Sequence, residues 1–180
     1  MKSILTAVLV MLTIMVNAQP TPQSADVIMK DAYQQAAREN KNVIVMFHAS
    51  WCIWCHKMDS SLLDPSCRKF FNDNYVIKHI VVAESKDKKS LETPGGEEMR
   101  VKYKAEEQGI PFWLILDKNG KLLADSKIRP EGAGFDTEGD NAGCPASETE
   151  VSYFLRVLKA SSRLTDEQLE VIRKRFRQNE

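Results

Sequence analysis

The stretch VIVMFHASWCIWCHKMD, residues 43–59, decides the fold of this chain. Its first part, residues 43–47, is a continuous apolar run rich in β-branched side chains, which is typical of a strand covered on both faces. Residues 52–63 predict a helix, and Pro65 ends it. The sequence CIWCH at the centre fits both the C-x-x-C motif of a thiol redox site and the C-x-x-C-H motif of a covalently attached c-type haem.

The spacing of Cys52 and Cys55 suits a disulfide best if the first cysteine caps the helix. Residues three apart inside a helix hold their Cβ atoms about 5–6 Å apart, whereas a disulfide needs about 3.5–4.5 Å. A cap position relaxes this constraint and points the free amides of the first turn at the sulfur of Cys52. Those amides favour the thiolate by at most about 2 kcal/mol. We therefore expect an exposed Cys52 sulfur that attacks and a less exposed Cys55 that resolves the mixed disulfide.

The rest of the chain alternates helices and strands in an order typical of an α/β protein. The turn DKNG at 117–120 predicts a hairpin, because Asn and Gly tolerate positive φ. Residues 84–96 are expected to form a surface loop, and residues 129–147 an irregular segment rich in Gly, Asp and Glu. The further predicted elements are helices at 24–40, 66–72, 97–107, 148–160 and 165–178, and strands at 75–82, 112–116 and 121–126.

This order predicts a mixed central sheet with helices on both faces and a C-terminal helical extension. The early strand, helix and strand imply a parallel pair, and the later hairpin adds antiparallel strands to the same sheet. Ser24 or Asp26 is expected to cap the first helix. Thr165 and Gln168 are expected to form a capping box at the start of the last one.

Composition and the N-terminus limit the partners and the compartment. Lys and Arg together number 25, as do Asp and Glu, so no net charge attracts nucleic acid or an anionic membrane. Lys2 precedes an apolar run at 4–16, and Ala18 suits cleavage by signal peptidase. The run is shorter than the about 20 residues of a spanning helix. We predict a signal peptide at 1–18, a single domain at 19–180 without membrane insertion, and export to a periplasmic or otherwise secreted location.

Two segments together resemble the thioredoxin superfamily: VIVMFHASWCIWCHKM, and GIPFWLILDKNGKLLAD at 109–125. They look closest to exported thioredoxin-like proteins with a Trp-Cys-x-x-Cys active site, and the similarity covers residues 26–126. The resemblance implies a thioredoxin fold for this core, followed by the extension at 127–180. It also implies a thiol:disulfide oxidoreductase that acts on protein thiols and disulfides. Another redox protein would supply or remove electrons, and no metal or organic cofactor is implied.

The resemblance also implies a role for individual residues. Cys52 would be the nucleophile and Cys55 the resolving thiol of a redox-active disulfide. Pro111 would be the cis-proline of the family, packed against that disulfide. The backbone of Ile110 would then be free to pair with an extended substrate segment, and Trp51 would form part of an apolar rim around the sulfur.

Two departures from the family pattern leave questions open. Met46 stands where many thioredoxins place a buried carboxylate behind the resolving cysteine. Glu84 or water is then left as the proton acceptor for Cys55. The bulky pair Ile53 and Trp54 between the cysteines does not fix a redox potential, so both reduction and oxidation of substrates stay open.

Two other interpretations compete with the redox one. The first is a c-type haem protein for electron transfer, with both cysteines in thioether bonds and His56 as an axial ligand. The β-branched strand that runs into the motif and the later Ile-Pro hairpin weigh against it. The second is a thioredoxin-fold binding protein in which the bond between Cys52 and Cys55 is never turned over.

The remaining cysteines have structural interpretations. Cys67 is expected to be a small buried apolar group, and Cys144 is either free or paired with Cys67, with the unpaired state favoured. A zinc site made of Cys52, Cys55 and Cys67 lacks a second paired motif, so no metal is expected. His48 is interpreted as a core histidine.

Overall fold

The computed structural model describes residues 21–180, and the predicted signal peptide at 1–18 lies outside the described residues. The α-helices are α1 (Ala25–Glu39), α2 (Ile53–Leu62), α3 (Arg68–Asn74), α4 (Gly96–Lys102), α5 (Glu148–Ser161) and α6 (Asp166–Phe176). The strands are β1 (Asn42–His48), β2 (Tyr75–Val81), β3 (Phe112–Leu116), β4 (Leu122–Asp125), β5 (Lys127–Ile128) and β6 (Asp140–Asn141). Two short 3₁₀ helices, η1 (Lys86–Leu91) and η2 (Arg177–Asn179), complete the described elements.

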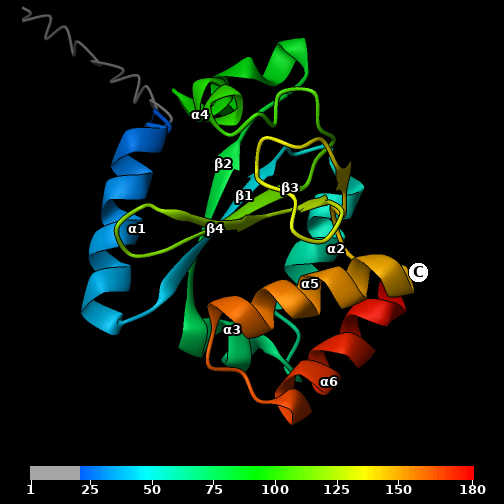
Figure 1. Ribbon diagram of the computed structural model, residues 1–180. Coiled ribbons are helices and arrows are strands. Elements are labelled where there is room, and N and C mark those ends of the chain that lie inside the picture. Colours follow the sequence, from blue (N-terminus) through cyan, green and yellow to red (C-terminus); the bar gives the residue numbers. More distant parts are fainter. Residues whose placement is uncertain (1–20) are drawn as a thin grey trace, which may run out of the picture.

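The central sheet has the strand order β2-β1-β3-β4 (Figure 1). β1 and β2 are parallel, whereas β3 pairs antiparallel with both β1 and β4, so the predicted mixed sheet is confirmed. The predicted hairpin at 117–120 is confirmed as well. The carboxylate of Asp117 accepts the backbone N–H groups of Asn119 and Lys121, and Gly120 has a φ of 83°. Only a residue that tolerates this left-handed conformation fits the turn.

One face of the sheet is covered by α1 and α4. Side chains alternate between the two faces of a strand, and Val43, Val45 and Phe47 of β1 point to this one. They pack with an apolar stripe of α1 that includes Ala32, and Met99 of α4 packs against the same cluster. Ser24 caps α1, as predicted, by accepting the N–H of Val27. Figure 1 shows α1 beside the sheet and α4 near one end of it.

The opposite face is covered by α2, α3, α5 and α6. Ile44 and Met46 of β1 point to it. Phe71 of α3 and Phe154 of α5 have ring centroids 6.3 Å apart, and Phe154 and Phe176 of α6 have centroids 5.0 Å apart. The helices of the C-terminal extension therefore share one hydrophobic core with α2 and α3. The architecture is a thioredoxin fold with added C-terminal helices.

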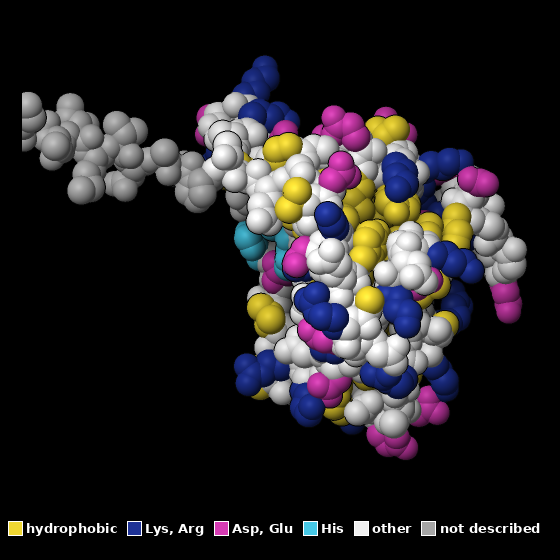
Figure 2. All heavy atoms as spheres, turned by 90° about the vertical axis from the view of Figure 1, so that its left-hand side faces the viewer, with side chains coloured by type: hydrophobic (Ala, Val, Ile, Leu, Met, Phe, Trp, Pro, Cys, Tyr) yellow, Lys and Arg dark blue, Asp and Glu magenta, His cyan; other side chains and the backbone are white. Residues whose placement is uncertain are grey.

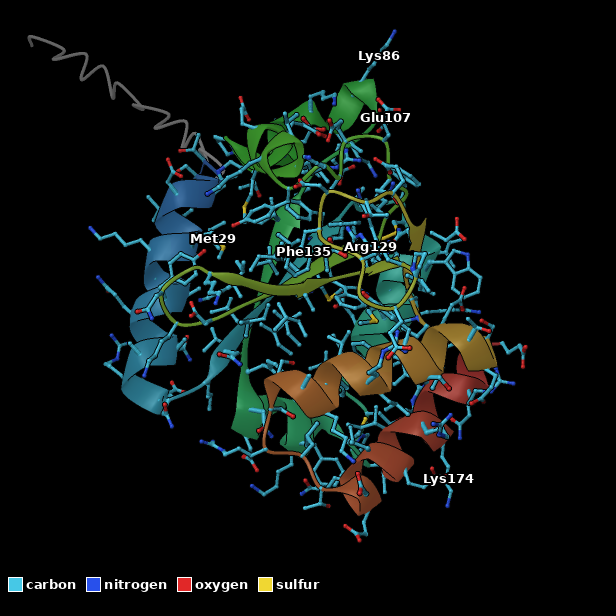
Figure 3. All side chains as sticks on the ribbon, in the orientation of Figure 1. Met29, Lys86, Glu107, Arg129, Phe135 and Lys174 are labelled. Atoms are coloured by element: carbon cyan, nitrogen blue, oxygen red, sulfur yellow. A yellow bond between two sulfur atoms is a disulfide. The ribbon has the colours of Figure 1, made fainter. Side chains whose placement is uncertain are left out.

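The segment between β4 and α5 is tied to the sheet by a buried ion pair. The guanidinium of Arg129 binds the carboxylate of Asp125 at 2.7 Å, and both side chains are buried. The guanidinium also lies 5.8 Å from the ring centroid of Phe135, and Figure 3 shows these two side chains close together. The prediction of an irregular segment at 129–147 is wrong at one place, because β6 lies within it and pairs antiparallel with β5, which directly precedes it.

The predicted helix at 97–107 is too long. α4 ends at Lys102, because Arg100 of its last turn binds the chain that follows. The Nη2 group of Arg100 donates to the carbonyl oxygens of Ala105, Glu106 and Gln108, each at 3.0 Å, and so curls this segment around the guanidinium. The predicted loop at 84–96 contains η1.

The last two helices both begin with capping boxes. Thr165 and Gln168 form the predicted one in α6, and Ser147 and Glu150 form a second, unpredicted one in α5. No helix formed by residues 21–180 has the length and apolar character needed to cross a membrane.

Candidate active site

The site is built on the first turn of α2. Cys52 is the N-cap residue, and its Sγ accepts the backbone N–H of Cys55 at 3.1 Å. The two sulfurs are bonded to each other, with a Cα–Cα distance of 5.2 Å. The cap position therefore brings the cysteines within disulfide distance, as the spacing predicted.

Ile110, the residue before Pro111, lies against this disulfide. The Ile110–Pro111 peptide bond is cis, as the resemblance implied, and it precedes β3 directly. The carbonyl oxygen of Ile110 is 3.5 Å from Sγ of Cys52, and Ile110 packs on a small cluster of Ala49, Cys52 and Cys55. Among residues 21–180, nothing accepts a hydrogen bond from the N–H of Ile110. One backbone donor beside the disulfide is thus unpaired.

The expectation of an exposed Cys52 sulfur is wrong. Cys52 is 3% exposed, because its sulfur turns inward toward the amide of Cys55 and the carbonyl of Ile110. The apolar neighbours are exposed instead, with Trp51 at 55%, Ile53 at 72% and Trp54 at 47%. The indole N–H of Trp51 donates to the carbonyl of Ala83 at 2.9 Å, which fixes this part of the rim.

A groove of about 240 Å³ lies next to the disulfide, on the side of Ile110. Trp54 and the turn at 109–111 form one part of its lining, and the segment before α5 forms the other. Asn141 of β6 joins the two parts. Its Nδ2 donates to the carbonyls of Gly109 at 2.7 Å and Pro111 at 3.2 Å, and its Oδ1 accepts from the N–H of Gly143 at 3.0 Å. Sequence reasoning missed Asn141, since no local pattern links it to a turn thirty residues away.

The loop before Cys52 is held by Glu84. The carboxylate of Glu84 is buried and accepts both the N–H of Ser50 at 2.5 Å and its hydroxyl at 2.8 Å. Glu84 was one of the two predicted proton acceptors for Cys55, but its oxygens are engaged with Ser50. Met46, at the position of the missing carboxylate, is fully buried in the apolar core.

The other two cysteines are free thiols, as favoured from the sequence. Cys67 and Cys144 are both buried, and burial raises the pKa of Cys67 and raises the pKa of Cys144 to about 12. In the described part of the chain no group of three His, Cys, Asp or Glu side chains is arranged to hold a metal ion.

The geometry around the motif does not favour the haem interpretation. The ring nitrogen Nε2 of His56 is hydrogen-bonded to the carbonyl of Ser50 at 3.0 Å, whereas an axial ligand needs that nitrogen free. The sulfurs lie under Ile110 in a tightly packed cluster. Thioether bonds would require both sulfurs to face a haem instead.

Comparisons with known proteins agree with this site. A protein family described as thioredoxin-like matches residues 27–118. The disulfide bond reductase DsbH of Chlamydia pneumoniae is 27% identical over 106 residues, which are 57% of this chain and 61% of that protein. The chain thus aligns with less than two thirds of this relative's length.

Solved structures with a similar chain course include two bacterial proteins. The disulphide isomerase from Xylella fastidiosa Temecula1 is 21% identical, with 65% of this chain and 80% of that one covered and a TM-score of 0.46. The oxidised C-terminal domain of DsbD from Neisseria meningitidis is 17% identical, with 74% and 97% covered and a TM-score of 0.43. Because the family match spans more than half of the chain and includes the Cys52–Cys55 pair, this chain belongs to the thioredoxin-like family.

Proposed function

We propose that this protein is an exported thiol:disulfide oxidoreductase that exchanges disulfides with cysteine-containing proteins through Cys52 and Cys55. The observation that carries the proposal is the disulfide at the start of α2, packed against the cis Ile110–Pro111 bond. A disulfide that staples a fold together has no need of a helix N-terminus beside it. The amide that bonds Cys52 Sγ stabilises a thiolate there, which both an attacking and a leaving sulfur require.

The exchange proceeds in two balanced steps. The thiolate of Cys52 attacks one sulfur of a substrate disulfide, so that a mixed disulfide forms, the substrate bond breaks and the released substrate thiolate takes up a proton. Cys55 then loses its proton and attacks Sγ of Cys52, which forms the Cys52–Cys55 bond and releases the second substrate thiol. The substrate gains two electrons and the cysteine pair loses two. Oxidation of a substrate dithiol is the reverse sequence.

The surroundings of the pair suit a polypeptide substrate. The unpaired N–H of Ile110 can donate to the backbone of an extended segment, and Pro111 keeps the chain turned away from it. The exposed rim of Trp51, Ile53 and Trp54 offers apolar contact area. Cys52 itself is almost fully buried, and the groove lined by Trp54 and Ile110 beside it offers a place for the substrate chain.

We also propose the location and the partners. The domain at 19–180 would act in a periplasmic or otherwise secreted location after removal of residues 1–18, and a second redox protein would supply or remove its electrons. The name of the Chlamydia pneumoniae relative, a disulfide bond reductase, makes reduction the first direction to test. No metal or organic cofactor is needed for either step.

Two measurements on the purified protein test the proposal. Equilibration with glutathione buffers gives the reduction potential of the Cys52–Cys55 pair, and reduction of insulin disulfides in the presence of dithiothreitol gives the catalytic rate. We expect a reversible two-electron transition and a rate above that of dithiothreitol alone. Cys52→Ala should abolish both while leaving the far-ultraviolet circular dichroism unchanged. An activity that survives in this variant would contradict the proposal.

A further inference from the structure

The three histidines of this chain come from three different elements: His48 from β1, His56 from α2 and His79 from β2. The rings of His48 in β1 and His79 in β2 have centroids 4.9 Å apart. Nε2 of His79 is 2.7 Å from a carboxylate oxygen of Asp59 in α2. Figure 2 shows histidine side chains gathered at one edge of the face that it presents. The sheet and α2 thus enclose a polar cluster of His48, His79 and Asp59.

His48 contains an unsatisfied polar atom. Its Nε2 is buried and has no hydrogen-bond partner within residues 21–180. Buried polar atoms without partners are rare in folded proteins, and each one calls for a structural or chemical reason. The sequence interpretation of His48 as an ordinary core histidine does not supply one, because a core histidine has its ring nitrogens bonded.

The topology places His48 beside the resolving cysteine. Side chains two apart in β1 share a face, so His48 points to the same side as Met46, the side that α2 covers. α2 runs back along β1 from the strand end, and Cys55 is one helical turn before Asp59 on the same side of the helix. Ala49, the residue after His48, packs in one cluster with Cys52 and Cys55, so Cys55 lies beside the strand end that carries His48.

We propose that His48 accepts the proton of Cys55 when Cys55 resolves the mixed disulfide. This inference rests on the proposed function and completes its second step. The Cys55 thiol transfers its proton to Nε2 of His48, the resulting thiolate attacks Sγ of Cys52, and the substrate thiolate leaves. In the reverse direction the imidazolium returns the proton to Cys55. Met46, on the same side of β1, has no group that accepts a proton, and the carboxylate of Glu84 is hydrogen-bonded to Ser50.

The electrostatics of the cluster suit an acceptor. Burial lowers the pKa of His48 below its ordinary value of 6.5, and the neighbouring His79 lowers it further, with His56 adding to this effect. The carboxylates of Asp59 and Glu84 act in the opposite direction. The ring is therefore uncharged at neutral pH and can take up a proton. Asp59 and His79 remain partly exposed, which gives the cluster contact with solvent.

The test separates the two steps. Reduced protein reacts with dithiobis(nitrobenzoic acid), whose coloured thiol is released once when Cys52 attacks and again when Cys55 resolves the mixed disulfide. We expect His48→Gln to slow the second phase by about 10²-fold, which is typical of a lost general base. In the native protein the second phase should fall with decreasing pH through an inflection below 6.5, the ordinary pKa of histidine. The variant should instead show a rate proportional to hydroxide.

His56→Gln is the matched control, because it makes the same substitution on an exposed residue of α2. The second phase should keep its rate at neutral pH, and its inflection should move to higher pH, because His56 lowers the pKa of His48. Asp59→Asn provides an independent test if His48→Gln folds poorly. Removing the carboxylate removes an influence that raises the pKa of His48, so the inflection should move to lower pH. A second phase that is unchanged in His48→Gln, or an inflection that is unmoved in Asp59→Asn, would overturn the inference. Absence of the first phase in the native protein would instead refute the proposed function.

Discussion

Two helices of this protein start at a cysteine, and the two sulfurs face opposite kinds of polar group. At the start of α2, Sγ of Cys52 accepts the N–H of Cys55 at 3.1 Å. At the start of α3, Sγ of Cys67 donates to the carbonyl of Ser61 at 3.1 Å, and no side chain caps that helix. An N–H donor favours a thiolate or a disulfide sulfur, whereas a carbonyl acceptor favours the protonated thiol. The cap position alone therefore does not make a cysteine reactive.

The surroundings widen this difference. Cys67 is fully buried in the aromatic core around Phe71, and burial raises its pKa. Cys52 is almost as buried, but it lies next to the groove at Pro111 and beneath an exposed apolar rim. Cys52 and Cys67 therefore do not differ in solvent exposure. They differ in the hydrogen-bond partner of the sulfur and in the groove that lies next to Cys52 alone.

The largest expected effect is on thiol reactivity. In the reduced protein near neutral pH, iodoacetamide should modify Cys52 at least about 10²-fold faster than Cys67 or Cys144, because only thiolates react and burial keeps the other two protonated. Peptide mass spectrometry after a timed quench measures each rate. In urea all four cysteines should react alike, which serves as the control. Equal rates at Cys52 and Cys67 in the folded protein would remove the distinction between the two helix starts.

The features that sequence reasoning placed correctly are local ones. The strand at 43–47, the hairpin at 117–120 and the cap at Cys52 each follow from residues within one or two turns of one another. The cis bond before Pro111 followed from the family resemblance. Local chain geometry and a motif shared with a family carry this information directly.

The features it missed depend on contacts between distant segments. The burial of Cys52 depends on Ile110, and the early end of α4 depends on carbonyls that Arg100 gathers from the following loop. The polar cluster of His48 and His79 forms only when β1 and β2 pair in register. Hydrophobic periodicity does not encode such pairings, because the residues involved are polar and isolated in the sequence.

The groove beside the start of α2 depends on Asn141, whose hydrogen bonds tie the turn at 109–111 to the segment before α5. Asn141→Ala removes the hydrogen bonds to the carbonyls of Gly109 and Pro111 and leaves the N–H of Gly143 without its acceptor. We expect the free energy of unfolding to fall by about 2 kcal/mol, since each lost bond costs about 0.5–1.5 kcal/mol. Urea unfolding measures the loss. We also expect a raised KM for a protein disulfide, because the turn that carries Ile110 is loosened.

Asn72→Ala is the matched control for this substitution. Asn72 is exposed on α3, so its replacement should change the free energy of unfolding by no more than about 0.5 kcal/mol. If Asn141→Ala has the same free energy of unfolding as this control and keeps the native KM, then the segment before α5 does not support the groove.

The last expected effect, which is confined to alkaline pH, concerns the protonation of a buried thiol. Burial raises the pKa of Cys144 from 9.0 to about 12 in the folded protein, so above pH 9.0 the folded state holds a proton that the unfolded state has lost. The stability that Cys144 contributes is fully present below the pKa of the unfolded state. It is lost as the pH rises toward the pKa of the folded state, and the free energy of unfolding then falls by up to about 1.4 kcal/mol per pH unit. Urea unfolding of the oxidised protein across this range should therefore show a steeper decline for the native chain than for Cys144→Ala. Other groups whose pKa is raised by burial, such as Tyr75, are present in both proteins. Their effects cancel when the two unfolding curves are subtracted. Parallel curves would mean that Cys144 ionises as easily in the fold as outside it, and burial would then not be what keeps this thiol protonated and unreactive.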